Sequence, residues 1–154
     1  MREIDNLIRP LMRENGFRLK GTSWYRIKED FIQVLNFQKS LYGDDYYLNL
    51  AFDLSNDLLC FPPDYKFLPE YRYPIRIRAE NIPFIETTKK KYTFDIKSSE
   101  RVRKVIVETI ENCLVFLNEY SEKSKFFPYF QENPHLMIVW EEKQKLIEKG
   151  LLKG

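Results

Sequence analysis

The stretch Ile32-Gln33-Val34-Leu35-Asn36-Phe37-Gln38-Lys39-Ser40 decides how the fold of this chain is predicted. A strand with one buried face alternates apolar and polar residues. Here the amides fall on both faces, with Gln33 on one face and Asn36 and Gln38 on the other. The pattern therefore predicts a sheet whose two faces are both partly occupied. It identifies no reaction.

Composition places the chain among globular proteins. Its 154 residues are 44% hydrophobic and 31% charged, which predicts a single globular domain spanning residues 1–154. The net charge of +2 is too small to indicate a nucleic-acid-binding protein from bulk electrostatics. Two cysteines are too few for a disulfide scaffold, and no apolar run approaches the roughly 20 residues that span a bilayer. We expect a cytoplasmic protein with reduced thiols.

Hydrophobic spacing and turn residues predict an α+β fold. The expected strands form a mostly antiparallel sheet, in which a meander of three strands is extended by one or two more. An N-terminal helix and two C-terminal helices are expected to pack on this sheet. The predicted helices cover residues 3–15, about 99–122 and 136–151, and the predicted strands cover residues 18–28, 31–39, 46–54, 75–78 and 92–96.

A two-residue turn at Glu29-Asp30 gives a trial register for the sheet. Tyr25 then opposes Val34, and Val34 opposes Phe52 across the next hairpin. The face that carries Val34 is apolar apart from Ser23, Asn36 and Gln38, so it is the predicted core face. A slip of one residue in register would exchange the two faces. The opposite face is aromatic and mostly basic, and it carries Trp24, Arg26, Lys28, Phe31, Gln33, Leu35, Phe37, Lys39, Tyr47, Asn49 and Asp53.

The first third of the chain resembles a family of bacterial proteins known only as a domain of unknown function. The matching residues are Pro10-Leu11, Gly16-Phe17, Gly21, Trp24-Tyr25-Arg26, Ile32-Gln33-Val34, Asn36-Phe37-Gln38-Lys39-Ser40 and Leu48-Asn49-Leu50. Beyond them, Arg76-Ile77 and a long helix fit in order and type. Relatives with a Cys-His pair before that strand differ from this chain, which has Tyr73-Pro74 there. The resemblance implies a compact α+β domain and no assigned activity.

Two groups of residues are candidate sites. Ser23, Asn36 and Gln38 form either the wall of a ligand pocket or a buried network whose partners are backbone groups. The aromatic face offers a docking surface for a protein, or a platform for single-stranded bases, unless the protein's own helices cover it. Its candidate binding residues are Trp24, Arg26, Gln33, Phe37, Lys39, Tyr47 and Asn49.

No catalytic, metal-binding or cofactor-binding motif is recognised. His135 is the only histidine, which excludes sites that need two, and the five glycines form no phosphate-binding loop. Arg72, Arg76, Arg78 and Lys89-Lys90-Lys91 make a basic set that more often belongs to solvated loops than to a nucleic-acid site.

The leading hypothesis is a non-enzymatic binding module that recognises another protein, as adaptor or immunity proteins do. Two alternatives stay open: nucleic-acid binding through the basic strands, and a small-molecule binder or enzyme with a pocket around Asn36 and Gln38. No membrane partner is expected, and the sequence leaves the oligomeric state open.

Overall fold

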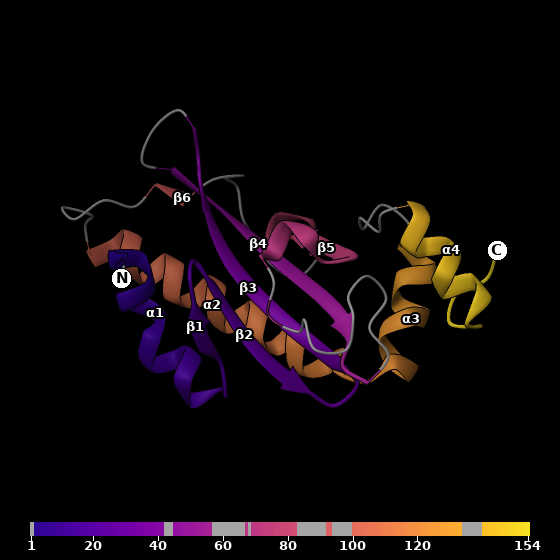
Figure 1. Ribbon diagram of the computed structural model, residues 1–154. Coiled ribbons are helices and arrows are strands. Elements are labelled where there is room, and N and C mark those ends of the chain that lie inside the picture. Colours follow the sequence, from indigo (N-terminus) through magenta and orange to yellow (C-terminus); the bar gives the residue numbers. More distant parts are fainter. Residues whose placement is uncertain are drawn as a thin grey trace.

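The computed structural model describes residues 2–41, 45–56, 67, 69–82, 92–93, 100–133 and 140–154. Its helices are α1 (Glu3–Glu14), α2 (Glu100–Glu119), α3 (Lys123–Glu132) and α4 (Trp140–Glu148), with short 3-10 turns η1 (Glu70–Arg72) and η2 (Ala79–Asn81). Its strands are β1 (Arg18–Lys20), β2 (Ser23–Lys28), β3 (Phe31–Lys39), β4 (Asp45–Leu54), β5 (Ile75–Arg78) and β6 (Tyr92–Thr93). The long helix α2 runs across the sheet, and α3 and α4 lie at one end of it (Figure 1).

The strands form one antiparallel sheet in the order β1-β2-β3-β4-β5, and β6 pairs with β4 as well. The central β3 and β4 are the longest strands, with nine and ten residues. This arrangement confirms the predicted α+β class, with a mostly antiparallel sheet and helices at both ends of the chain. Of the predicted strand 92–96, Tyr92 and Thr93 lie in β6, and the rest falls outside the described residues.

The predicted strand 18–28 is in fact a hairpin. Lys20 opposes Ser23 across a turn of Gly21 and Thr22, so β1 folds back on β2. Gly21 has φ +63°, in the left-handed region that glycine enters without a steric penalty. The glycine breaks the run of β-forming residues and adds an edge strand to the sheet.

The predicted register holds for one hairpin and fails for the next. Tyr25 opposes Val34, as the turn at Glu29-Asp30 predicts. Between β3 and β4, however, Val34 opposes Ala51 and not Phe52. This shift of one residue moves every β4 side chain to the other face of the sheet.

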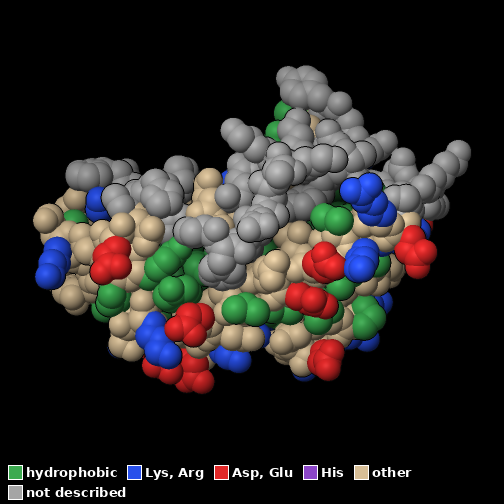
Figure 2. Space-filling model, turned by 180° about the vertical axis from the view of Figure 1, so that it is seen from behind, with side chains coloured by type: hydrophobic (Ala, Val, Ile, Leu, Met, Phe, Trp, Pro, Cys, Tyr) green, Lys and Arg blue, Asp and Glu red, His purple; other side chains and the backbone are tan. Residues whose placement is uncertain are grey.

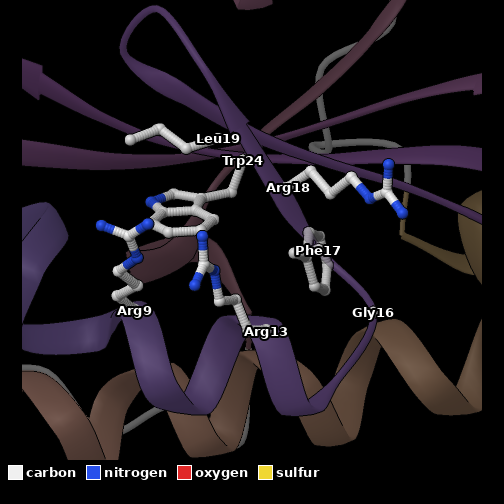
Figure 3. Close-up of a pocket in the computed structure, with 7 residues that line it drawn as sticks. All are labelled: Arg9, Arg13, Gly16, Phe17, Arg18, Leu19 and Trp24. Atoms are coloured by element: carbon white, nitrogen blue, oxygen red, sulfur yellow. The ribbon is translucent and has the colours of Figure 1, made fainter.

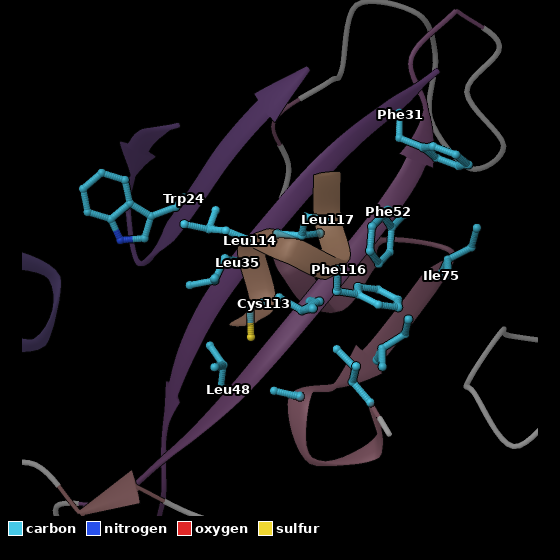
Figure 4. Close-up of a cluster of buried hydrophobic side chains, with 14 of the residues drawn as sticks. Trp24, Phe31, Leu35, Leu48, Phe52, Ile75, Cys113, Leu114, Phe116 and Leu117 are labelled. Carbon is cyan, nitrogen blue, oxygen red and sulfur yellow. The ribbon is translucent and has the colours of Figure 1, made fainter. Parts of the chain in front are cut away.

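The helices cover the aromatic face, an arrangement that the sequence had left open. Trp24, Phe31, Leu35, Phe37, Leu48, Leu50, Phe52, Ile75 and Ile77 point to this side and belong to the main core cluster, together with residues of α1, α2 and α3. Cys113, Leu114, Phe116 and Leu117 of α2 pack on the strand residues (Figure 4). The predicted core face was therefore wrong, and the aromatic face is the core.

The opposite face of the sheet is only partly apolar. Tyr25, Ile32, Val34, Ala51 and Tyr73 form a separate small cluster there. Toward the end that carries Asn36, the same face becomes polar and open. This division of one sheet face into an apolar part and a polar part creates the candidate site.

Candidate functional site

A groove of about 940 Å³ lies on the polar part of the sheet face opposite the main core. Residues of β1, β2, β3, β4 and β5 line it, and η1 with the segment just before it borders one side. We call it the sheet groove. It holds all three residues of the predicted polar pocket, Ser23, Asn36 and Gln38.

Four neighbouring side chains form a hydrogen-bonded amide network in the sheet groove. Asn36 Nδ2 donates to Ser23 Oγ at 2.9 Å and to the Thr22 carbonyl at 3.0 Å. Asn49 Nδ2 donates to Gln38 Oε1 at 3.1 Å and approaches Asn36 Oδ1 at 3.5 Å. Asn36 and Asn49 are adjacent because β3 and β4 pair them directly. The network fixes the orientation of the Asn36 and Asn49 amides. A site that recognises the hydrogen-bonding groups of a ligand requires such fixed orientations.

Cationic side chains surround this network. Arg2, Lys20, Lys39, Arg76 and Arg78 line the sheet groove, and Glu70 is the only carboxylate among the described lining residues. Arg2 is held in place by Asp5, at 2.7 Å between Nε and Oδ2, and by the Phe37 carbonyl at 2.6 Å. Burial raises the pKa of Glu70, while Arg76 and Arg78 oppose that rise. The electrostatic potential of the groove therefore favours an anionic ligand.

Aromatic rings complete the groove. Phe67 and Tyr71 line it while remaining 41% and 67% exposed, which is unusual for large apolar side chains. Phe67 packs edge-on against Tyr25, with 5.5 Å between ring centroids. Nearby, the Arg78 guanidinium carbon lies 4.1 Å from the centroid of the Tyr47 ring. Such stacking holds an arginine in one orientation and leaves its other side available for a ligand.

The residues predicted to form an aromatic binding face are divided between the two sides of the sheet. Trp24 and Phe37 are 1% exposed in the main core, and the Trp24 indole Nε1 donates to Asp5 Oδ1 at 3.2 Å. Lys39 and Asn49 instead line the sheet groove, and Tyr47 lies beneath Arg78. Within the sheet groove, Lys39 and Asn49 can therefore contact a ligand directly, and Tyr47 contributes through Arg78.

Arg26 and Gln33, two more of these candidates, form a buried polar network under the helices. Arg26 Nε donates to Gln33 Oε1 at 2.8 Å, and Gln33 Nε2 donates to the Leu117 carbonyl of α2 at 2.7 Å. Arg26 also donates to the Asn15 carbonyl and to Asn118 Oδ1. These contacts join α1, α2 and the sheet, so the pair is part of the structural framework.

Sequence reasoning missed the groove residues that lie outside the central strands. Arg2 comes from the start of the chain, and Phe67, Glu70 and Tyr71 come from the long connection between β4 and β5. Periodicity does not place such residues on a sheet face. Composition was the one sequence signal that could have indicated these residues, because the connection combines prolines with aromatic residues, of which Phe67 and Tyr71 are exposed.

The face turned away from the viewer in Figure 1 differs in charge from the groove. Lys, Arg, Asp and Glu side chains are intermixed on the described part of that surface (Figure 2). A shallow cavity beside α2, for example, is lined by Arg103 and Lys104 together with Glu100, Glu108 and Glu111. A surface of mixed charge gives no preference for an anion, in contrast to the sheet groove.

Three further observations concern the part of the chain that the structure describes. Within it, no group of three or more His, Cys, Asp or Glu side chains is placed to hold a metal ion. No helix there is long and apolar enough to cross a membrane. The predicted features at Cys60, Lys89-Lys90-Lys91 and His135 lie outside the described residues.

Comparison with protein families matches residues 8–120 to the family described as a domain of unknown function, DUF4304. The match begins within α1 and ends just after α2, so it includes the whole sheet. Searches of curated proteins and of solved structures found no match.

Proposed function

This chain belongs to the DUF4304 family of domains of unknown function, and from that premise we propose that it is a non-enzymatic binding module for another protein. The sheet groove takes an acidic, extended segment of the partner. Arg76, Arg78 and Lys39 attract its carboxylates, and Tyr71 and Phe67 contact its apolar side chains. The amide network of Ser23, Asn36, Gln38 and Asn49 hydrogen-bonds its backbone.

One observation carries the proposal: five cationic side chains and two exposed aromatic rings line a concave surface that holds one described carboxylate. Arginine and tyrosine are enriched among the residues that dominate protein–protein binding energy. An exposed ring next to a stacked arginine gives both an apolar anchor and a carboxylate anchor. The groove volume of about 940 Å³ suits a short peptide segment or a metabolite and is too small for a folded domain.

The location of the site differs from the first expectation for a structural reason. The aromatic face predicted to bind a partner packs under the helices, where Trp24 and Phe37 fill the core. Docking on that face would require the helices to separate from the sheet. The opposite face offers amides, cations and rings without any such rearrangement.

A second candidate function is the binding of single-stranded nucleic acid. It is favoured by the same exposed rings, since bases stack on aromatic side chains next to a basic groove. This function predicts an affinity that falls steeply with salt, because phosphate contacts release counterions. A protein partner held by apolar anchors is expected to show a weaker salt dependence.

We place the module in the cytoplasm. Cys113 is a free thiol in the core, and burial raises its pKa to about 12, so it stays protonated and unreactive at neutral pH. A reducing compartment is the natural setting for such a domain. The described groove lining offers cations, amides and rings, which suit binding better than nucleophilic catalysis.

The test begins with native mass spectrometry of the untagged protein purified gently from its own host. A partner protein identified there is then titrated against purified wild type and against Tyr71→Ala and Arg76→Gln. We expect each substitution to weaken binding by about tenfold, since each removes an anchor worth about 1.4 kcal/mol or more. Arg103→Gln on α2 is the matched control, because it removes one exposed cation outside the groove.

The outcomes separate the candidate functions. Loss of the partner in both groove variants, with unchanged thermal melting and an unaffected control, supports the protein-binding module. Bound nucleic acid whose release follows rising salt supports the second candidate. A bound metabolite lost in Asn49→Ala moves the function to small-molecule binding. If the groove variants bind the partner as wild type does, the sheet groove is not the docking site.

A further inference from the structure

A second cavity, of about 690 Å³, lies between α1 and the β1–β2 hairpin, away from the sheet groove. Three arginines line it: Arg9 and Arg13 from α1, and Arg18 from the start of β1. Its apolar wall includes the buried rings of Phe17 and Trp24. We call it the arginine cavity.

Charge is the distinctive property of the arginine cavity. No carboxylate is among the described residues that line it. Arg9 and Arg13 are four residues apart on one helix, a spacing at which like charges destabilise the helix by a few tenths of a kcal/mol. The helix dipole favours a cation in the last turn of α1, where Arg13 lies. Arg9 and Arg18 lie outside that turn, so the dipole does not account for their positions. Three cations and no described carboxylate line the cavity, so its electrostatic potential favours an anion.

Figure 3 shows how the side chains are directed. Arg9 and Arg13 both rise from α1 toward the Trp24 indole, and Arg18 extends in another direction. A hydrogen bond fixes the orientation of the indole, because its Nε1 donates to Asp5 Oδ1 at 3.2 Å. Two guanidinium groups thus converge over a rigid aromatic wall in a space that has solvent access.

Space for a ligand is available beside the helix end. Gly16, at φ +82°, ends the turn after α1 and also lines the cavity. A methyl group added at Gly16 would meet no atom within 4 Å, so this side of the cavity is open.

We propose that the arginine cavity binds an oxyanion of the phosphate class between Arg9 and Arg13. The planar guanidinium presents paired N–H donors that match two oxygens of such an ion. Arg18 contributes long-range attraction from the rim of the cavity. The site is distinct from the sheet groove, because the two cavities share no lining residue, although β1 and β2 contribute residues to both.

The test uses Trp24 as the reporter. The chain has two tryptophans, so Trp140→Phe leaves Trp24 as the only one. Inorganic phosphate is titrated at constant ionic strength, with chloride as the balancing ion, while Trp24 fluorescence and thermal melting are recorded. We expect a saturable fluorescence change and a rise in melting temperature that depends on phosphate concentration.

Two double variants decide whether the effect is specific. In Arg9→Gln/Arg13→Gln, phosphate affinity is expected to fall by about tenfold or more, since a hydrogen bond to a charged group contributes roughly 1.5–3 kcal/mol. Arg103→Gln/Lys104→Gln loses the same charge from the exposed side of α2 and is expected to keep wild-type affinity. Circular dichroism shows whether each variant is folded, and Arg13→Gln alone, at an exposed position, serves if the double variant is not.

Two results would overturn the proposal: a wild-type protein whose Trp24 fluorescence and melting do not respond to phosphate, or an equal loss of affinity in both double variants. Titration with O-phosphoserine then identifies the form of the ligand. Tighter binding than inorganic phosphate supports a phosphate ester, and equal or weaker binding supports the free ion.

Discussion

Within the described part of the chain, Arg26 is a buried charge whose hydrogen bonds go to neutral groups. Its guanidinium donates to Gln33 Oε1, the Asn15 carbonyl and Asn118 Oδ1 at 2.8–2.9 Å, and its Cζ lies 4.5 Å from the centroid of the Phe17 ring. Burial lowers the pKa of this arginine to about 10. The favourable contacts therefore act against a desolvation cost, and the residue serves to join α1, α2 and the sheet.

We expect Arg26→Ala to lower the free energy of unfolding by about 3 kcal/mol, because it leaves buried oxygens without donors and removes the packing on Phe17. Urea denaturation followed by circular dichroism measures this change. The exposed Arg103→Ala is the control, with an expected change within about 0.5 kcal/mol. Equal effects of the two substitutions would show that the Arg26 network contributes nothing to stability.

Cys113 gives a prediction about pH. The buried thiol keeps its proton up to a pKa of about 12, while in the unfolded chain it ionises near pH 8.5. Between these values the unfolded state binds fewer protons than the folded state, so stability falls as pH rises, by about 1.4 kcal/mol per pH unit. Below the unfolded pKa this group has no effect on the pH dependence.

The measurement is the free energy of unfolding of wild type and of Cys113→Ala between neutral pH and pH 10. Other groups titrate in both proteins, so the difference between the two curves isolates Cys113. We expect the wild type to lose stability more steeply above about pH 8.5. Parallel curves over this range would mean that the thiol is accessible to ionisation in the folded protein.

At the scale of the residue, the sequence could predict part of the site. Ser23, Asn36 and Gln38 were found because alternation along a strand puts them on one face, and Arg76 and Arg78 were noted as basic. Asn49 was assigned to the wrong face, although it pairs with Asn36. Phe67 and Tyr71 come from a connection whose path no periodic pattern determines. Short-range spacing therefore found the amides, and tertiary structure added the aromatic rings.

Among the structural elements, the β2–β3 turn contains a residue with a strained backbone conformation, which substitutions can test. Glu29 has φ +50°, a left-handed conformation that costs a non-glycine residue about 1 kcal/mol. The turn is held in place by Ser55, whose Oγ donates to the Glu29 carbonyl at 3.2 Å and whose N–H donates to the Asp30 carbonyl at 2.8 Å.

Asparagine enters this conformation more easily than glutamate, and β-branched residues rarely adopt it. We therefore expect Glu29→Asn to raise the free energy of unfolding by about 0.5 kcal/mol and Glu29→Val to lower it by about 1–2 kcal/mol. Thermal melting of the two variants tests the pair. A change of the same sign in both would show that the backbone of the turn is not strained.

The same turn explains which part of the sheet the sequence could predict. Two loop residues fix the register of β2 against β3, and that register was confirmed. The longer connection from β3 to β4 fixes no register, and the prediction there was wrong by one residue. The error was not visible in the pattern, because Arg26 and Gln33 make the true core face look polar while Ile32 and Val34 make the other face look apolar. Buried hydrogen bonds between these polar groups and α2 are invisible to a hydrophobicity pattern.

On the scale of the whole molecule, the hydrophobic core includes residues that lie beyond the C-terminal end of the family match. The match ends at residue 120, before α3. Yet Phe126 of α3 stacks within 4.6 Å of Phe31 and 4.9 Å of Phe52, measured between ring centroids. Phe127 and Phe130 are also buried in the main cluster. The sheet and α2 therefore leave the core open at one end, and α3 closes it.

We expect a fragment of residues 1–122 to lose cooperative folding, although it contains the whole family match. Removing one buried phenylalanine side chain costs about 3–5 kcal/mol, and domains of this size are stable by about 5–15 kcal/mol, so the loss of three is more than most domains tolerate. Thermal melting followed by near-ultraviolet circular dichroism distinguishes a native core from a collapsed chain. Within the full chain, Phe126→Ala should lower the free energy of unfolding by about 3–5 kcal/mol, while the exposed Lys125→Ala should change it by less than about 0.5 kcal/mol. A fragment that melts cooperatively at the temperature of the full chain would show that the matched segment is a self-sufficient domain and that α3 is an addition to it.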